Sequence, residues 1–346
     1  MRQILVELPS KALAVLAICL AIAVLIRDLL QYRSKAIRAW SSTPWLLFGG
    51  AWALLGLRGG SWVPTRSVLV GPWVSLPIFS YGVMLGTSLV VGWFLVMKLA
   101  KKDGVPNSDA GRIYMWSAVW SMVGARALYV LTNLSSFDGF LDAVMLHKGG
   151  MVAYGGMIGG FLASWYGCFR RGIPLLKWAD ASAPAVVLGT GITRIGCFLY
   201  GCDFGRPSSL PWALAFPNGS AAWDHHIRIG LVTPDAAWSM PVHPTQLYES
   251  LVGFALFGFL MWLRKHRTFS GQVFLGWVLG YGTLRPLIEL LRDDEQRGNV
   301  GPLSTSQFIG IISVTFGLAL LAILLRKNKL KPGSLRYWES NQTSEP

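Results

Sequence analysis

Apolar runs long enough to cross a bilayer recur along this chain and constrain its fold more than any other feature. In the main body they span about 80–98, 111–132, 151–169, 178–200, 244–263, 271–291 and 305–325. A hydrocarbon core about 30 Å thick needs roughly 20 apolar residues per helix, and 53% of the chain is hydrophobic whereas only 14% is charged. The sequence therefore predicts an all-α polytopic membrane protein with about seven core transmembrane helices.

Two further apolar runs precede this body, at 11–26 and about 43–58. The first is predicted to be an uncleaved span, because no small-residue cleavage site with a polar segment after it follows the run. The second is short for a span and is predicted to be tilted, interfacial or re-entrant. We therefore expect one or two extra helices in an N-terminal membrane extension, residues 1–64, before a transmembrane core at 65–330 and a cytoplasmic tail at 331–346.

Basic clusters occupy every second connection between the runs. They are Lys98, Lys101 and Lys102; Arg170, Arg171 and Lys177; Arg264, Lys265 and Arg267; and Arg326, Lys327, Lys329 and Lys331. The positive-inside rule places these connections in the cytoplasm. The loops at 133–150, 201–243 and 292–304 are then external, and 201–243 is long enough for a small external subdomain. Membrane orientation also accounts for the net charge of +14, so nucleic-acid binding is not expected.

Two arginines lie near the outer ends of their runs, Arg126 and Arg194. An arginine within a span costs at least about 2.5 kcal/mol by insertion scales, so it normally faces the protein interior and is paired. We therefore expect an anion beside Arg194. The alternative is an arginine that only extends to the lipid headgroups.

Other runs bring polar groups to the same outer level. Pro244 suits a first helical position, which places His243 at the helix cap and lets Gln246 turn back towards it. Tyr81 and Tyr154 begin their runs on this side, as site residues or as interfacial tyrosines. One polar stripe at positions i, i+4, i+8 and i+11 is formed by Tyr281, Arg285, Glu289 and Arg292.

Three arginines and one nearby carboxylate, Glu289, leave a surplus of positive charge at this level. Glu289 can form a purely structural salt bridge with Arg285 and Arg292. Otherwise the surplus needs a mobile anion, and a lipid phosphate of the outer leaflet is the obvious one. This reasoning predicts a lipid-using enzyme or a lipid-binding protein and leaves the reaction open.

Cys197 and Cys202 lie five residues apart near the end of one run. Without histidines at ligand spacing they are a weak metal signal, and a disulfide or two unpaired thiols is favoured. No metal site is therefore expected.

Several motifs occur in a fixed order between residues 65 and 330. They are Ser80–Met84, Gly124–Tyr129, Lys148–Gly160, Thr193–Phe198, Gly205–Arg206, His243–Glu249 and Tyr281–Arg292. In order and spacing the chain resembles the prolipoprotein diacylglyceryl transferases of bacterial cytoplasmic membranes. The element His-Pro-Thr-Gln-Leu-Tyr-Glu is especially specific.

The resemblance implies a multi-pass protein of the bacterial inner membrane, with a seven-helix body and an active site that faces outwards. Such an enzyme moves the diacylglyceryl group of phosphatidylglycerol, a membrane lipid, to the lipobox cysteine of a preprolipoprotein. Glycerol-1-phosphate leaves, and no metal, nucleotide or other cofactor is implied. By position, Arg194 and Arg292 match the family's key arginines, which we assign to the lipid phosphate. The substrate-binding set is completed by Tyr81, Arg126, Gly205, Gln246, Glu249, Arg285 and Glu289.

The chain departs from the family pattern at several positions. Tyr154 replaces a histidine proposed to help deprotonate the thiol, and an unperturbed tyrosine, with a pKa near 10, is a poor base at neutral pH. Cys197 replaces the usual asparagine and Cys202 the usual acidic residue, with Asp203 one place on. The family's usual Arg-x-Pro-Asp is replaced here by Arg292-Asp-Asp-Glu.

These departures leave the base role open. Tyr154, His243 or an external histidine can assume it, or the chemistry needs little base assistance. The external histidines are His147, His225 and His226.

Two other functions compete with the transferase. A diverged paralogue would use the same phospholipid site on another acceptor, with Cys197 and Cys202 as redox or acceptor thiols. A non-catalytic lipid-binding or transport protein would show broken helices in matching halves, and no internal repeat is evident.

Overall fold

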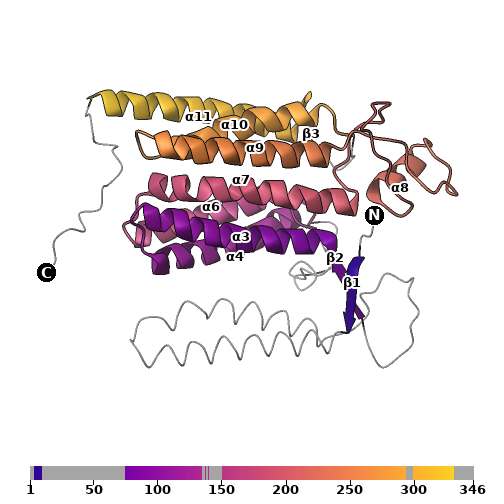
Figure 1. Ribbon diagram of the computed structural model, residues 1–346, viewed down its shortest axis with the longest axis horizontal. Helices are drawn as coiled ribbons and strands as arrows, with labels where there is room; N and C mark the ends of the chain where they lie inside the picture. The colour runs from indigo at the N-terminus through magenta and orange to yellow at the C-terminus, as the bar shows by residue number, and fades with distance from the viewer. Residues whose placement is uncertain are drawn as a thin grey trace.

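Seven long helices lie roughly side by side in the computed structural model, which describes residues 4–9, 75–134, 137, 139, 150–293 and 299–330 (Figure 1). They are α3 (Ser80–Lys102), α4 (Asn107–Thr132), α6 (Ala153–Arg170), α7 (Leu175–Tyr200), α9 (Thr245–His266), α10 (Gln272–Glu289) and α11 (Thr305–Leu330). Each of the seven apolar runs of the main body thus coincides with a helix, within a few residues at either end. The short helix α8 (Ala221–Arg228) lies beyond one end of this body.

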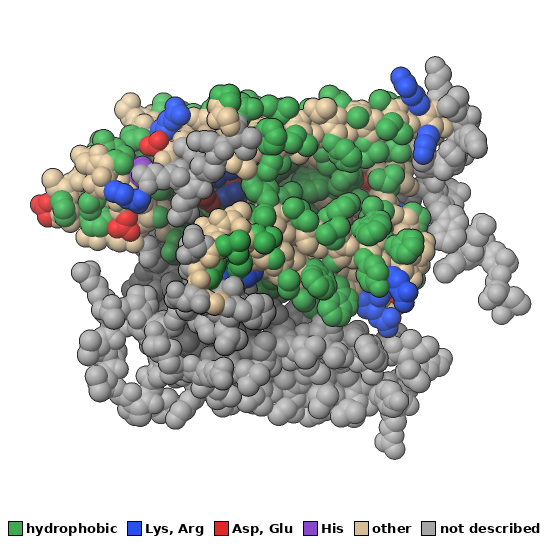
Figure 2. Space-filling view, turned by 180° about the vertical axis from the view of Figure 1, so that it is seen from behind, with side chains coloured by type: hydrophobic (Ala, Val, Ile, Leu, Met, Phe, Trp, Pro, Cys, Tyr) green, Lys and Arg blue, Asp and Glu red, His purple; other side chains and the backbone are tan. Residues whose placement is uncertain are grey.

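Four helices in the described part of the chain are long and apolar enough to cross a membrane: α3, α7, α9 and α11. Hydrophobic side chains cover the middle of the body (Figure 2). Phe94, Phe169 and Leu251 are each about 70% exposed on helix surfaces, which is costly in water and ordinary in lipid. The chain is therefore a multi-pass membrane protein, and the count of seven spans stays a prediction.

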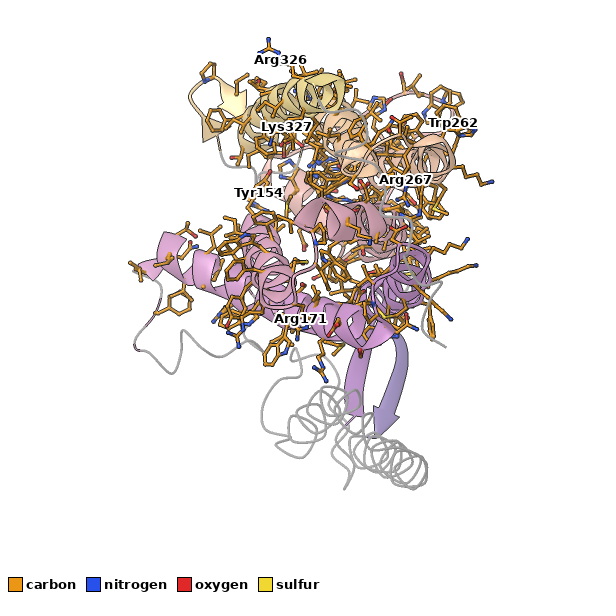
Figure 3. All side chains as sticks on the ribbon, turned by 90° about the vertical axis from the view of Figure 1, so that its left-hand side faces the viewer. Tyr154, Arg171, Trp262, Arg267, Arg326 and Lys327 are labelled. Atoms are coloured by element: carbon orange, nitrogen blue, oxygen red, sulfur yellow. The ribbon has the colours of Figure 1, made fainter. Side chains whose placement is uncertain are left out.

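The basic connections gather at one end of the body. Figure 3 views the protein from that end, where Arg171, Arg267, Arg326 and Lys327 are labelled. The charge alternation of the sequence predicts this grouping. The side of the membrane that this end faces also stays a prediction.

A buried ion cluster joins α3 to α9 at the basic end. The Asp103 carboxylate accepts hydrogen bonds of 2.6 Å from both Arg264 and Arg267. The Asp103 side chain is only 1% exposed. The sequence suggests only loop charges at Arg264 and Arg267, yet both guanidinium groups are largely buried against this carboxylate.

Asp180 ties α7 to the start of α10 at the same end. Its carboxylate accepts hydrogen bonds from the backbone N–H groups of Gly271, at 2.8 Å, and Phe274, at 2.9 Å. These amides belong to the first turn of α10, where a helix has unpaired donors and favours negative charge. Arg264 of α9 donates to the Asp180 carbonyl as well, so α7, α9 and α10 meet here.

Helices α4 and α6 pack mainly on each other through glycines. A Cβ at Gly155 would meet the Gly124 carbonyl oxygen, and one at Gly159 would meet the Trp120 carbonyl oxygen. Small residues let helix backbones approach this closely in membranes. Gly155, Gly156, Gly159 and Gly160 thus form the face of α6 that contacts α4, while Met157 and Ile158 between them are exposed.

Gly159→Leu is expected to lower the free energy of unfolding by about 2–3 kcal/mol, because the added side chain has to push α4 away from α6. Thermal unfolding in detergent would measure the change. Gly86→Leu is the matched control, since nothing lies within 4 Å of a Cβ at this helical glycine. Equal losses in the two variants would contradict the close packing.

Residues 201–243 fold back over the end of the body opposite the basic one. Phe204, Phe216, Ala222 and Val242 form a small buried core there. Ser220 caps α8 by accepting a hydrogen bond from the Trp223 N–H. This unit has its own core, as a small subdomain requires.

Two small antiparallel sheets complete the described structure. Strand β1 (Ile4–Pro9) pairs with β2 (Ser75–Phe79), and β3 (Asn299–Val300) pairs with β4 (Leu303–Ser304). The predicted helices at 11–26 and 43–58 lie outside the described residues.

Candidate functional site

The end of α7 is a tight turn that sends the chain back past its own last residues. Gly201 has a φ of +83°, in the left-handed region that glycine adopts without strain. The N–H groups of Gly201 and Cys202 both donate to the Cys197 carbonyl, at 2.8 and 3.2 Å. This helix cap brings Cys202 and Asp203 beside the C-terminal end of α7, the helix that carries Arg194.

Asp203 bridges two arginines from separate parts of the chain. One carboxylate oxygen lies 2.5 Å from Arg194 Nη1 and the other 2.6 Å from Arg292 Nη2. Asp203 has a φ of +57°, which Asp tolerates better than most residues, and its carbonyl accepts from Thr245 Oγ1 at 2.7 Å.

Sequence reasoning gave Asp203 no role. It stands one place from the position where an acid was expected. The signal that could have found it is an aspartate directly after a glycine-capped helix, a setting that suits a left-handed residue.

Glu249 of α9 lies at the centre of the cluster. Its carboxylate contacts Arg194 Nε, Arg285 Nε at 3.0 Å and Arg292 Nη1 at 3.8 Å. The side chain is only 4% exposed. The prediction that Arg194 faces inwards and is paired is confirmed, and the anions beside it are carboxylates of the protein.

Glu289 completes the set. It lies 2.5 Å from Arg285 Nη1 and 3.9 Å from Arg292 Nε. Three guanidinium groups therefore face three carboxylates. The guanidinium groups belong to Arg194, Arg285 and Arg292, and the carboxylates to Asp203, Glu249 and Glu289. The prediction of a surplus of positive charge is wrong. Asp203, from the turn after α7, and Glu249, from α9, add two carboxylates beside the arginines.

Arg292 reaches the cluster from a turn and does not lie on the helical stripe predicted from Tyr281 to Arg292. Helix α10 ends at Glu289, and Arg292 forms a β-bridge with Gly205. A Cβ at Gly205 would lie 2.7 Å from the Leu291 carbonyl oxygen and from the His243 carbonyl oxygen. Gly205 is therefore needed where three backbone segments converge, and this packing aims Arg292 at Asp203.

The ionisation of Asp203 follows from its neighbours. Burial alone would raise the pKa of this carboxyl, but the guanidinium groups of Arg194 and Arg292 outweigh burial and hold its pKa below the ordinary value of 3.8. The carboxylate is therefore charged at neutral pH. Its contribution to stability is present above the ordinary pKa and is lost only as the pH falls through the lower folded value.

The start of α9 differs from the expected cap. The helix begins at Thr245 with Pro244 as the N-cap, one residue later than predicted. Gln246 is buried and donates a 2.6 Å hydrogen bond to the Cys202 carbonyl, so it does not turn back to His243. Gln246 thus fixes the turn that carries Asp203.

His243 is the first member of a short polar chain. Its Nδ1 lies 3.3 Å from the Tyr248 hydroxyl, which accepts a 2.8 Å hydrogen bond from Trp212 Nε1. The His243 backbone is paired with Gly205 and Arg206. The imidazole is therefore held on the segment that neighbours the arginine cluster.

The remaining predicted site residues occupy three different places. Tyr81 begins α3 against the end of α7, where a Cβ at Gly196 would lie 3.2 Å from Tyr81 Cα. Arg126 is buried, donates to the Gly150 carbonyl at 3.0 Å and lies over the ring of Tyr129. The Tyr154 hydroxyl lies 3.4 Å from Ser306 Oγ of α11.

The three histidines predicted to be external fall into two groups. His225 and His226 pack on the ring of Phe204, with centroids 5.4 and 5.9 Å away. Burial lowers the pKa of His226, and its Nδ1 accepts from the Met240 N–H at 3.1 Å. Both rings serve the core of the subdomain, while His147 lies outside the described residues.

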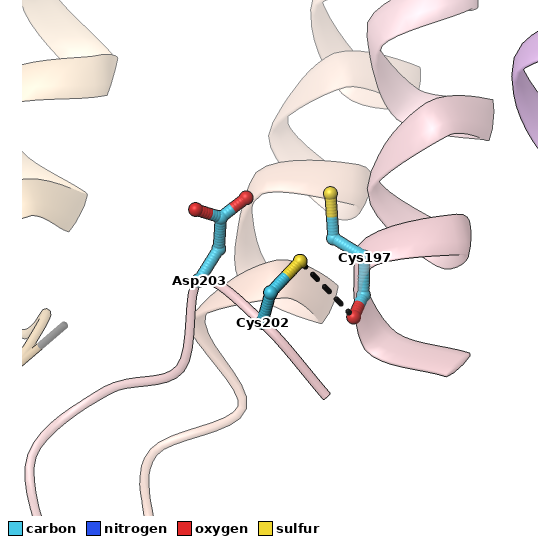
Figure 4. Close-up of side chains that lie close together, drawn as sticks. All are labelled: Cys197, Cys202 and Asp203. Carbon is cyan, nitrogen blue, oxygen red and sulfur yellow. Dashed lines mark hydrogen bonds between the residues drawn. The ribbon is translucent and has the colours of Figure 1, made fainter. Parts of the chain in front are cut away.

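Cys197 and Cys202 are free thiols beside Asp203 (Figure 4). One potential ligand atom from each of these three side chains lies within 4.8 Å of the other two. The sequence predicts either a disulfide or two unpaired thiols at these positions, and the structure has two unpaired thiols. Asp203 already binds two arginines, so this trio is a poor cation site.

Known proteins resemble this chain over most of its length. The family described as prolipoprotein diacylglyceryl transferase matches residues 69–323. The phosphatidylglycerol–prolipoprotein diacylglyceryl transferase of Clostridium tetani is 32% identical over 248 residues, which cover 72% of this chain and 94% of that protein. The protein of the same name from Thermus thermophilus is 33% identical over 275 residues, covering 73% of this chain and 96% of its own. That of Streptomyces griseus is 30% identical over 291 residues, or 82% of each chain.

Proposed function

Because this chain belongs to the prolipoprotein diacylglyceryl transferase family, we propose that it transfers the diacylglyceryl group of phosphatidylglycerol to the lipobox cysteine of preprolipoproteins. The chain is a transferase of lipoprotein biosynthesis. A thioether forms at the cysteine, and glycerol-1-phosphate leaves. The observation that carries the proposal is the cluster in which Arg194 and Arg292 converge on Asp203.

The arginines of the cluster serve the phosphate. The thiolate attacks the glycerol carbon, the carbon–oxygen bond breaks, and its electron pair goes to the phosphate oxygen. Negative charge on the phosphate grows in this step, so donors that bind the leaving phosphate more tightly than the lipid lower the barrier. Arg194 and Arg292 are these donors, and the lipid phosphate takes the place of Asp203 at one or both of them.

Glu249 and Glu289 act as positioning residues in this scheme. Each holds Arg285 at 3.0 Å or less, and Glu249 also holds Arg194. A guanidinium held on one edge presents its free edge in a fixed direction. Tyr81, Arg126, Gly205 and Gln246 complete the proposed substrate-binding set.

The arrangement in the membrane follows from the basic end. We place residues 65–330 in the bacterial inner membrane as seven spans, with the basic end and the tail at 331–346 in the cytoplasm. The arginine cluster and residues 201–243 then face outwards. A preprolipoprotein and the outer leaflet are both available on that side.

His243 takes the proton of the acceptor thiol. An imidazole exchanges protons readily near neutral pH, and the backbone of His243 is tied to the segment beside Arg292. The Tyr154 hydroxyl instead lies 3.4 Å from Ser306 Oγ of α11, which is not a member of the arginine cluster.

His243→Gln is expected to lower kcat about a hundredfold, the usual contribution of a positioned base, while Tyr154→Phe stays within about threefold of the wild type. Initial rates at saturating lipid would measure both. Tyr248→Phe is the matched control, because it removes the hydroxyl beside His243 and keeps the imidazole. The reverse result, with Tyr154→Phe as the silent enzyme, would assign the base role to Tyr154.

The function itself is tested with purified protein, phosphatidylglycerol labelled in its diacylglycerol part and a lipobox peptide. We expect the label to move to the peptide and glycerol-1-phosphate to be released in equal amount. A control peptide with serine in place of the lipobox cysteine should receive no label. A folded wild-type protein that binds the lipid and labels neither peptide would favour the paralogue that uses another acceptor.

A further inference from the structure

The geometry points to a reversible disulfide between Cys197 and Cys202 that switches the arginine site off. The two thiols are unpaired, and their sulfur atoms lie within 4.8 Å of each other. The Cys202 N–H already donates to the Cys197 carbonyl at 3.2 Å, so the two backbones are held together across the cap of α7. A disulfide needs a sulfur–sulfur distance of about 2.05 Å, which side-chain rotation towards the facing sulfur supplies.

The two sulfurs differ in access. Cys197 is buried, whereas Cys202 is half-buried in the turn after α7. The Cys202 thiol points at the Cys197 carbonyl, with its sulfur 3.8 Å from that oxygen (Figure 4). An external oxidant therefore meets Cys202 first, and Cys197 is the buried partner that resolves the intermediate.

The chemistry is thiol–disulfide exchange with a disulfide-bonded small molecule or protein outside the membrane. A hydrogen bond with Cys197 and burial raise the pKa of the Cys202 thiol, so the exchange is slow at neutral pH and speeds up as the pH rises. The Cys202 thiolate attacks one sulfur of the oxidant and releases the other as a thiol that takes up the proton. Cys197 then attacks Cys202 in the mixed disulfide and releases the second thiol. Two thiols of this chain become one disulfide, and one disulfide of the oxidant becomes two thiols.

Oxidation changes the surroundings of Arg194 directly. Arg194 Nη1 lies 3.7 Å from Cys197 Sγ, and Asp203 follows Cys202 in the chain. Asp203 sits in a left-handed conformation and holds Arg194 and Arg292. Closing the bond turns Cys197 Sγ away from Arg194 Nη1 and reorients the side chain of Cys202, the residue before Asp203, so the phosphate site changes with the thiols. This step rests on the proposed function, which assigns Arg194 to the lipid phosphate.

The test uses the full chain with Cys19→Ser and Cys168→Ser, which leaves one thiol pair, in nanodiscs. Glutathione disulfide is the oxidant, and mass spectrometry counts the thiols that remain open to alkylation. Phosphatidylglycerol binding is then measured in the oxidised and the reduced states. Cys197→Ser and Cys202→Ser in the same background are the matched controls, since neither can close the ring.

We expect the intact pair to lose both alkylation sites and to bind phosphatidylglycerol about tenfold more weakly when oxidised, a coupling of ordinary size. Dithiothreitol should reverse both changes. Each single variant should instead form a mixed glutathione disulfide or stay reduced, with no closed ring.

Three results would overturn the proposal. The first is a pair that stays open to alkylation under every glutathione ratio tried. The second is a disulfide that forms without changing lipid affinity. The third is stoichiometric zinc in the purified protein that protects both thiols. Absence of lipid binding by the reduced protein would instead overturn the proposed function, because thiol chemistry is measured independently.

Discussion

Arg194→Ala is expected to lower kcat/KM for diacylglyceryl transfer by about a thousandfold or more, the scale on which an arginine at a transferring phosphate contributes. The substitution removes a donor from the leaving phosphate and leaves Glu249, which is only 4% exposed, with one guanidinium fewer. Lipid binding should weaken as well, because the ground-state phosphate loses the same donor. The measurement is label transfer to the lipobox peptide under conditions where the protein remains folded.

Arg194→Lys separates charge from geometry. Lysine keeps the positive charge and cannot contact Asp203 and Glu249 with a planar fork, so we expect it to recover only a small part of the lost activity. Arg171→Ala is the matched control, because this arginine pairs with Asp109 at the opposite end of the body. Full activity of Arg194→Ala would remove Arg194 from the mechanism.

Glu249→Gln is expected to lower the free energy of unfolding by about 3–5 kcal/mol, the usual cost of breaking a buried ion pair by removing one partner. The substitution leaves Arg194, Arg285 and Arg292 at one level with two carboxylates in place of three. Added phosphatidylglycerol should restore part of the loss, because an anion that binds the folded state stabilises it by mass action. Thermal unfolding with and without the lipid would measure both effects.

Asp109→Asn is the control for the loss of a carboxylate. Its partner Arg171 is 24% exposed, and the Asp109 side chain is 29% exposed, so solvent already screens the pair and we expect a change of less than about 1 kcal/mol. An equal loss of unfolding free energy in Glu249→Gln and Asp109→Asn would mean that the buried ion pairs of Glu249 stabilise the fold no more than the exposed pair of Asp109.

The sequence predicts the helices well, because the physics that forms them is local. A run of about 20 apolar residues has to satisfy its backbone internally in a bilayer, and α3, α7, α9 and α11 follow directly from that condition. The limits of α10 are harder to predict. Arg292 continues the helical spacing from Tyr281, yet the chain leaves the helix at Glu289 to pair with Gly205.

The site shows the same division between local and non-local information. The inward orientation of Arg194 follows from the cost of an arginine in a span. The identity of its partners does not follow from that cost. Asp203 lies beside Arg194 because of a left-handed turn, and Glu249 belongs to a helix that starts about 50 residues later in the sequence. The charge balance of the cluster therefore depends on how α7, α9 and the end of α10 pack.

The glycine contact between α4 and α6 also has a mechanical consequence. Ion pairs fasten α3 to α9 at the basic end and α7 to α9 and α10 at the other, whereas α4 and α6 pack mainly on each other. At the basic end this pair shares a buried core with α3 and α7 through Ile113 of α4 and Cys168 of α6. A local disturbance of the other half, which carries Tyr154 and Arg126, would therefore leave the ion pairs of the arginine cluster in place.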